Sequence, residues 1–299
     1  SLDLNDDVFF DYKKGIIISI DTYNIGNHFV DFKNPDLVLK KILRSSISDL
    51  VCKGVQPKFY FISGSGNKKT FTKKNLYKIS KSIHEEQKKY KIKLSGGDTT
   101  FSNQLSFTIM SLGYSNKIIY RNKAKLNDDI YVTGNLGDSF IGLKILKNKI
   151  KIRKNLANYF INKYYKPDIH LDLTKHLVKL ANTSIDVSDG IITDLEKMLN
   201  KQNLSFLLDL DKIPISNPLK KLIKIKKLKK LNLISNGDDY QIIFTATSKK
   251  ARIIAKISKI LRIKISKIGK IISSKKRSAI IDEKGAQIVL KNKGYIHNF

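Results

Sequence analysis

Short apolar runs alternate with longer segments of helical periodicity along the chain. The run at 16–20 is mostly apolar and leads directly into Asp21, which predicts a buried strand with a carboxylate at its end. Asn34 and Pro35 predict the start of a helix, because Asn is a favoured N-cap residue and Pro fits the first turn. Apolar residues recur at helical spacing after this start, and Gly54 predicts the end of the helix.

The same alternation continues through the rest of the chain. Further strands are expected at 58–62, 92–95, 105–112, 130–133, 184–187, 205–210, 240–247 and 263–271. Further helices are expected at 75–90, 138–147, 155–165, 174–181, 190–201 and 249–261. A hairpin is expected around Lys284 and Gly285. This alternation predicts an α/β or α+β fold, with one domain at 1–126 and a second at 127–299.

Two segments of this pattern allow more than one interpretation. The glycine-containing segment 64–69 could cradle a phosphate, but it lacks a complete phosphate-binding fingerprint and is expected to be a plain connection. The segment 219–231 carries seven lysines between positions 220 and 230. A solvated helix face is its favoured interpretation, and a helix that docks on a membrane or a polyanion is the alternative.

Basic residues exceed acidic residues by a wide margin. The chain has 57 Lys and Arg against 26 Asp and Glu, a net charge of +31, and only six of the basic residues are Arg. Base recognition relies on the forked Arg side chain, so a nucleic-acid partner is not favoured. A drift of composition toward Lys is favoured over a selected polyanion-binding surface. In either case the positive field would attract phosphorylated small molecules.

The single cysteine, Cys52, excludes an internal disulfide and any zinc site built from several cysteines. A reducing cytoplasm is therefore the expected location. No stretch approaches the roughly 18 uncharged apolar residues that a membrane span requires, and the first residues lack the pattern of a signal peptide. No membrane partner is expected.

Aspartate dominates the acidic residues, with 22 Asp against only four Glu. Several Asp residues stand where an expected strand meets a loop, although each one alone fits a helix cap or a turn. If these carboxylates converge, each pair about 4 Å apart repels by roughly 4 kcal/mol at an effective dielectric constant of about 20. Such a cluster requires cations to neutralise it.

Oxygen ligands favour Mg²⁺, which proteins usually hold through few carboxylates together with phosphate oxygens. The five dispersed His residues disfavour a zinc or iron site. No Walker A pattern, protein-kinase glycine-rich loop or dinucleotide-binding GxGxxG is present. The residues by themselves therefore predict Mg²⁺-dependent phosphoryl or nucleotidyl chemistry.

An ordered set of motifs covers essentially the whole chain and resembles the thiamine-monophosphate kinase family, within the aminoimidazole ribonucleotide synthetase-like superfamily. Each motif alone is common, whereas their order is specific. The motifs are Asp6-Asp7, Ser19-Ile20-Asp21-Thr22, Gly26-Asn27-His28-Phe29, Ser48-Asp49-Leu50, Gly96-Gly97-Asp98-Thr99-Thr100, Tyr131-Val132-Thr133-Gly134, Ile185-Asp186-Val187-Ser188-Asp189-Gly190, Gly237-Asp238-Asp239-Tyr240 and Gly294-Tyr295.

The resemblance implies ATP-dependent phosphorylation of thiamine monophosphate to thiamine diphosphate, with several Mg²⁺ ions. It also implies a two-domain fold, in which the N-terminal sheet pairs across a homodimer and the C-terminal domain closes over the site. The implied metal ligands are Asp7, Ser19, Ile20, Asp21, Asp49, Asp98, Asp186 and Asp189. The implied ATP contacts are Gly97, Asp98, Arg121 and Ser188, and the implied substrate contacts are His28, Asp238 and Tyr295.

Some positions depart from the family pattern. Ile20 replaces the usual Thr, so only its backbone carbonyl could contact a metal, and Asp238 is one methylene shorter than the usual Glu. His28 alone would also fit a structural hydrogen-bonding role. Because the acceptor is already an ionised phosphate, no residue is expected to act as a nucleophile or a base. The alternatives are another ATP-dependent enzyme of the superfamily, resembling aminoimidazole ribonucleotide or selenophosphate synthetase, a basic nucleic-acid-binding protein and a non-catalytic nucleotide sensor.

Overall fold

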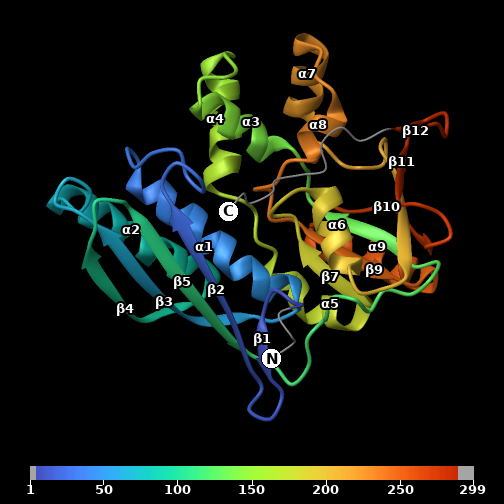
Figure 1. Ribbon diagram of the computed structural model, residues 1–299, viewed down its shortest axis with the longest axis horizontal. Coiled ribbons are helices and arrows are strands. Elements are labelled where there is room, and N and C mark those ends of the chain that lie inside the picture. The colour runs from blue at the N-terminus through green and yellow to red at the C-terminus, as the bar shows by residue number, and fades with distance from the viewer. Residues whose placement is uncertain (1–4, 289–299) are drawn as a thin grey trace.

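The computed structural model describes residues 5–288, which form two sheets with helices packed around them (Figure 1). The N-terminal sheet has five strands in the order β1-β2-β5-β3-β4. Its strands are β1 (Phe9–Asp11), β2 (Ile16–Asn24), β3 (Pro57–Gly66), β4 (Lys93–Phe101) and β5 (Ser106–Tyr114). Helices α1 (Pro35–Cys52) and α2 (Lys73–Tyr90) pack on one face of this sheet and form one core with it.

The C-terminal sheet has seven strands in the order β12-β11-β8-β10-β6-β9-β7. They are β6 (Asp129–Thr133), β7 (Thr183–Asp186), β8 (Leu204–Asp209), β9 (Ile242–Ala246), β10 (Ile265–Ser273), β11 (Ala279–Ile281) and β12 (Gln287–Ile288). The α-helices of this half are α3 (Asp138–Leu146), α4 (Lys154–Tyr165), α5 (Thr174–Leu180), α6 (Ile191–Leu199), α7 (Asn217–Lys226), α8 (Lys230–Ile234) and α9 (Ala251–Leu261). Short 3₁₀ turns occupy Leu171–Leu173 and Ser248–Lys250.

The adjacent strands β6 and β9 of this sheet are buried on both faces, which explains why they are mostly apolar. On β6, Ile130 and Val132 face one core with α6, whereas Tyr131 faces the opposite core with α5 and α9. This alternation is the two-residue period of a strand covered on both sides. The mixed α/β architecture predicted from the sequence is therefore confirmed. Within residues 5–288, no helix is both long and apolar enough to cross a membrane.

Helix α1 lies between the N-terminal sheet and the C-terminal half and is buried on almost every side. Its apolar residues pack on the sheet, as the helical spacing predicted. Polar side chains at Lys41, Ser48 and Lys53 contact the C-terminal half at Asp238, Asp186 and the Ser184 carbonyl oxygen, respectively. One helix therefore carries several of the polar contacts that join the two halves, and Tyr164 Oη adds another by donating to the His28 carbonyl oxygen at 3.1 Å.

Several strands are longer than predicted. Strand β3 continues through Gly66, so the start of the predicted connection at 64–69 is strand, and β4 continues through the expected loop to Phe101. The reason is the parallel ladder between β3 and β4, which runs from Phe59 to Gly66. Close packing here requires glycine, because a Cβ at Gly97 would lie 1.9 Å from the Ile62 carbonyl oxygen.

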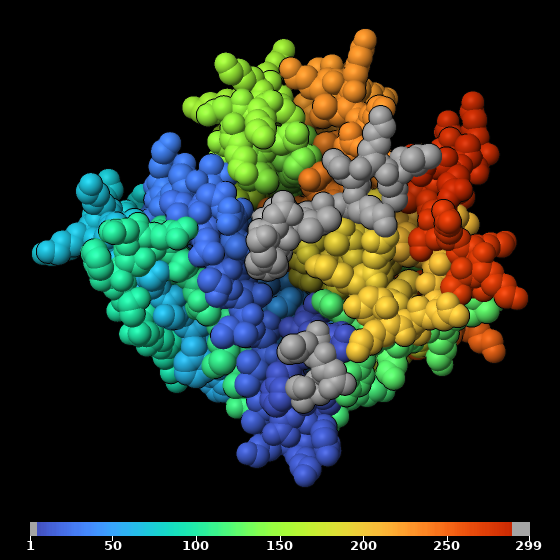
Figure 2. Space-filling model, in the orientation of Figure 1, coloured from blue at the N-terminus to red at the C-terminus, as the bar shows by residue number. Residues whose placement is uncertain are grey.

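The Lys-rich segment 219–231 forms two helices, α7 and α8, rather than one. Lys227 ends α7 in a left-handed conformation with φ of 51°. Both α7 and α4 project from the body of the molecule (Figures 1 and 2). The connection between β5 and β6 spans 115–128, so the predicted domain boundary at 126/127 falls between the two sheets.

Candidate active site

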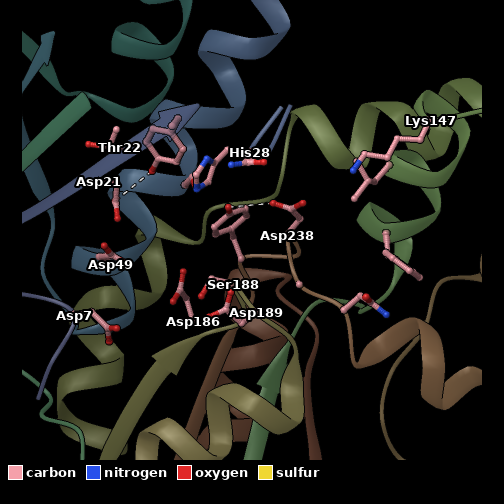
Figure 3. A pocket seen from close by; sticks show the side chains of 18 residues that line it. Asp7, Asp21, Thr22, His28, Asp49, Lys147, Asp186, Ser188, Asp189 and Asp238 are labelled. Carbon is pink, nitrogen blue, oxygen red and sulfur yellow. Dashed lines mark hydrogen bonds between the residues drawn. The ribbon is translucent and has the colours of Figure 1, made fainter. Parts of the chain in front are cut away.

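A cavity of about 460 Å³ lies beside α1 and is lined by both halves of the chain (Figure 3). Most of the predicted site residues meet here although they are far apart in the sequence. Those that line it are Asp7, Asp21, His28, Asp49, Asp186, Ser188, Asp189 and Asp238.

Asp21 on β2 and Asp49 on α1 face each other across the acidic end of this cavity (Figure 3). Ser19 donates a hydrogen bond to Asp49 Oδ2, and Tyr23 Oη donates one to Asp21 Oδ2 at 3.2 Å. Burial raises the pKa of Asp21, and burial together with neighbouring carboxylates raises the pKa of Asp49 well above its ordinary value. Ile20 points to the opposite sheet face and is 65% exposed, so its side chain takes no part in the site.

Asp186 ends β7 at the same end of the cavity, where Ser48 Oγ donates a hydrogen bond to its Oδ2 at 2.5 Å. Burial raises the pKa of Asp186. Lys53, at the end of α1, is completely buried and lies 2.7 Å from Asp7 Oδ2. It also donates a hydrogen bond to the Ser184 carbonyl oxygen at 2.9 Å, so the chain itself supplies one cation to this cluster.

Arg121 pairs with Asp7 through Nη2 and donates a hydrogen bond from Nε to Asp7 Oδ2 at 3.1 Å. Its backbone N–H also bonds Asp6 Oδ2 at 2.9 Å. The guanidinium is thus engaged by a carboxylate and does not line the cavity. An ATP contact by Arg121 remains a prediction.

The turn that follows β7 carries Ser188 and Asp189 toward the cavity. Asp194 supports this turn, because its Oδ2 accepts hydrogen bonds from the backbone N–H groups of Asp189 at 3.0 Å and Gly190 at 2.9 Å. Gly190 has φ of 118°, and a Cβ there would lie 2.2 Å from the Ser235 carbonyl oxygen. Burial raises the pKa of Asp194 well above its ordinary value.

The opposite end of the cavity combines apolar and polar side chains. Phe140 and Leu143 reach it from α3, whereas His28, in the turn after β2, lies edge-on against Tyr23 with ring centroids 5.7 Å apart. His28 Nδ1 accepts a hydrogen bond from the Asn24 backbone N–H at 3.0 Å, so this side chain holds its own turn in place while it lines the cavity. Asp238 lies on the wall between the two ends (Figure 3).

Two further predicted positions are not brought to this cavity within one chain. Gly97 and Asp98 lie on the edge strand β4, which β5 and β3 separate from β2. At a strand spacing near 4.8 Å, they are about 14 Å from β2. Tyr295 lies outside the described residues.

Sequence reasoning missed the lysines on α1. Lys41 and Lys53 are both almost completely buried, and both contact acidic residues at the cavity wall. Their signal in the sequence is the stripe that they form with Ser45, Ser48 and Asp49 at helical spacing. That stripe shows that these side chains share one face of a helix, but it does not show that a second domain covers this face.

The donor set of the cavity fits Mg²⁺. Its acidic end offers carboxylate and hydroxyl oxygens, the ligands that hard cations prefer. Within residues 5–288, no three His, Cys, Asp or Glu side chains are arranged to bind one metal ion together. The arrangement therefore suits ions that are shared between few carboxylates and the phosphates of a nucleotide, rather than a closed protein cage.

Comparisons with known proteins agree with this geometry. A family model described as AIR synthase related protein, N-terminal domain, matches residues 5–115. The thiamine-monophosphate kinase of Buchnera aphidicola subsp. Acyrthosiphon pisum is 34% identical over 289 residues, covering 94% of this chain and 87% of the relative. The Escherichia coli K12 thiamine-monophosphate kinase is 32% identical over 236 residues, covering 78% of this chain and 71% of the relative.

Solved structures share the fold along nearly the whole chain. The structure of AaThiL complexed with AMPPCP and TMP superposes with a TM-score of 0.84 at 23% identity, covering 98% of this chain and 92% of that chain. E. coli HypE, a hydrogenase maturation protein, superposes with a TM-score of 0.73 at 14% identity, covering 95% of this chain and 88% of that chain. The predicted two-domain synthetase-like fold is confirmed by these likenesses. With relatives above 30% identity over most of its length, the chain belongs to the thiamine-monophosphate kinase family.

Proposed function

We propose that this protein transfers the γ-phosphoryl group of ATP to thiamine monophosphate, producing thiamine diphosphate and ADP. The observation that carries the proposal is the convergence of five carboxylates on one cavity. They come from four separate parts of the chain and are Asp7, Asp21, Asp49, Asp186 and Asp189. Membership of the thiamine-monophosphate kinase family supports the choice of substrate. A cytoplasmic location is part of this proposal, because the reaction consumes ATP.

The two ends of the cavity fit the two parts of the reaction. The carboxylate end would hold Mg²⁺ with the ATP phosphates, and Ser188 and Arg121 would contact ATP. The end with Phe140 and Leu143 offers apolar surface for the rings of thiamine monophosphate. Asp238 would face the positively charged thiazolium ring, and His28 would lie beside the same substrate.

The hydroxyl groups around the carboxylates prepare the site for ions. Tyr23 fixes one oxygen of Asp21, Ser19 fixes Asp49, and Ser48 fixes Asp186. Side chains held in this way require little rearrangement when a ligand arrives. Bound Mg²⁺ would neutralise the negative charge of the phosphates and the carboxylates.

The transfer itself depends on the orientation of the two substrates more than on proton transfer. The phosphate oxygen that attacks is already ionised at neutral pH, so no side chain has to remove a proton from it. The residues act by orienting both substrates for a direct in-line transfer. A phosphorylated protein trapped during turnover would contradict this mechanism.

We also propose that the protein forms a homodimer through the uncovered face of its N-terminal sheet. This face, opposite α1 and α2, carries Ile20, Met110 and Phe61 side by side on neighbouring strands. Ile20 is 65% exposed, and burial of such apolar surface favours association. Replacing Leu112 on the same face with Asp is expected to produce monomers in sedimentation experiments. The matched variant Tyr77→Asp, at an exposed position on α2, is expected to stay dimeric.

The proposed dimer gives Asp98 a role that one chain alone does not. Asp98 aligns with Ser63, Thr108 and Thr22 across the sheet, and Thr22 lines the cavity. A second sheet laid on this face would bring Asp98 and Gly97 toward the partner's copy of the cavity. Loss of activity in monomeric Leu112→Asp would support this arrangement.

One assay tests the proposed activity against its alternatives. ADP release is measured with Mg²⁺ and ATP, with thiamine monophosphate, an aminoimidazole precursor or selenide as acceptor. Turnover with thiamine monophosphate alone is expected. Turnover with another acceptor would move the protein to a neighbouring enzyme of the superfamily, and no turnover with stabilisation by Mg-ATP would indicate a nucleotide sensor. Tight, steeply salt-dependent binding of DNA or RNA would favour the nucleic-acid alternative.

A further inference from the structure

An ion pair between a buried lysine and a partly exposed aspartate crosses from α1 to the wall of the cavity. Lys41 is only 1% exposed, and its Nζ contacts Asp238 Oδ1. Nζ also lies 4.0 Å from the centre of the Tyr164 ring and 5.5 Å from the centre of the Tyr240 ring. The lysine is thus enclosed by one carboxylate and two aromatic faces, and no family motif described above includes it.

A buried ammonium group is costly unless an anion stays fixed beside it. Lys41 therefore requires Asp238 in one position. The backbone adds to this constraint, because Asp238 has φ of 68° and its N–H bonds the Ser188 carbonyl oxygen at 2.9 Å. Tyr240 Oη donates a second hydrogen bond to Asp238 Oδ1 at 3.2 Å, so two groups hold this carboxylate while a backbone hydrogen bond holds the residue that carries it.

The pair also connects two parts of the site that belong to different domains. Lys41 lies on the same helix as Asp49, two turns before it, whereas Asp238 follows α8 in the C-terminal half. A helix is rigid over two turns, so the ion pair fixes Asp238 relative to the carboxylate end of the cavity. Without Lys41, the carboxylate at 238 would be free to turn toward the cations of the acidic end.

We propose that Lys41 is a positioning residue that holds Asp238 where it accepts the positively charged ring of the phosphate acceptor. This inference rests on the proposed function, because the cationic ring belongs to thiamine monophosphate. Lys41 does not touch the reacting phosphates and acts only through Asp238. Loss of Lys41 therefore weakens acceptor binding and leaves the ATP end of the cavity unchanged.

The test measures steady-state kinetics of Lys41→Met with thiamine monophosphate and with ATP varied in turn. The expected result is a KM for thiamine monophosphate about tenfold higher, with kcat and the KM for ATP within threefold of the parent enzyme. Lys41→Arg keeps the charge and is expected to restore most of the acceptor affinity. Lys40→Met is the matched control, because Lys40 is the preceding residue on α1 and pairs with Glu85 on α2 instead.

A double-mutant cycle separates positioning from a purely structural role. In an Asp238→Asn background, Lys41→Met is expected to cause less than a threefold further change in KM. The proposal would be overturned if the effects of the two substitutions on KM multiplied in the double variant. It would also be overturned if Lys41→Met lost ATP affinity to the same extent, or if its KM for thiamine monophosphate were unchanged. If Lys41→Met does not fold, Lys41→Arg replaces it in the cycle. The change in KM that Lys41→Arg causes is then compared between the protein with Asp238 and the Asp238→Asn variant. A parent enzyme without turnover of thiamine monophosphate would overturn the proposed function and this inference together, whereas an active parent isolates the role of Lys41.

Discussion

Replacing Asp49 with Asn is expected to destroy most of the activity and yet stabilise the metal-free protein. Asp49 accepts a hydrogen bond from Ser19 and lines the same cavity as Asp21. Its burial and the negative charges of Asp21 and Asp186 raise its pKa well above the ordinary value. The folded protein therefore holds this carboxylate at a cost unless a cation is present.

The size of that cost follows from the geometry. Two ionised carboxylates about 4 Å apart repel by roughly 4 kcal/mol at an effective dielectric constant of about 20. Protonation relieves the repulsion, and holding a proton on an ordinary Asp carboxyl at pH 7 costs about 4 kcal/mol. The positive charge of Lys53 offsets part of this. The free energy of unfolding of Asp49→Asn is therefore expected to exceed that of the parent protein by about 1–2 kcal/mol, which corresponds to a rise in Tm of about 2–8 °C.

Thermal unfolding in EDTA and in Mg-ATP, together with the ADP-release assay, measures both effects. Asp49→Asn is expected to melt at a higher temperature in EDTA, to gain less from Mg-ATP than the parent protein, and to lose at least about 100-fold in kcat/KM, or about 2.7 kcal/mol. Asp172→Asn, at an exposed carboxylate outside the cavity, is the control for the EDTA measurement. A lower Tm in EDTA, or an unchanged response to Mg-ATP, would refute the argument that the carboxylates crowd one cation site.

Three further changes test other parts of the structure. Asp194→Ala removes the acceptor for the N–H groups of the turn at Asp189 and is expected to cost about 1–3 kcal/mol in urea unfolding, whereas Asp194→Asn keeps an acceptor and costs less. Burial raises the pKa of Asp239 to about 8, above its unfolded value of 3.8, so the folded state binds the extra proton between these values. Stability is therefore expected to fall as pH rises from about 4 to 8, and Asp239→Asn is expected to reduce this slope in denaturant titrations. Arg44→Met is expected to cost about 3–5 kcal/mol because it leaves buried Glu86 unpaired, and equal stability of the variant would show that this pair is dispensable.

The sequence predicted the order of most helices and strands because apolar periodicity records which faces are buried. The strand predicted at 92–95 is shorter than β4, because Gly96 and Gly97 have low intrinsic preference for a strand. Pairing with β3 decides the conformation there, and pairing partners lie far away in the sequence. Most lysines of the segment 219–231 are exposed, as a solvated helix face predicted, but the left-handed residue Lys227 divides the segment between two helices.

The carboxylates of the site could be predicted because each stands at the end of an apolar strand or within a specific motif. The lysines could not, because Lys on a helix ordinarily indicates a solvated surface. Lys41 and Lys53 are buried only because the C-terminal half covers the polar stripe of α1. Burial of this kind depends on domain packing, which a local pattern does not record.

That polar stripe explains how a cavity between two domains keeps a defined length. Asp49 faces its acidic end, and Lys41, eight residues earlier, determines where Asp238 lies on the wall between the two ends. Eight residues of helix rise about 12 Å, and a helix does not stretch. The spacing between the carboxylates and the charge at 238 is therefore set by the pitch of α1, and not by the turn after β7 or the loop that carries Asp238. Changes in that turn or loop that preserve contact with α1 should alter affinity without altering which acceptor length fits. A one-residue insertion between 41 and 49 should instead rotate Lys41 away by about 100° and separate Asp238 from the acidic end.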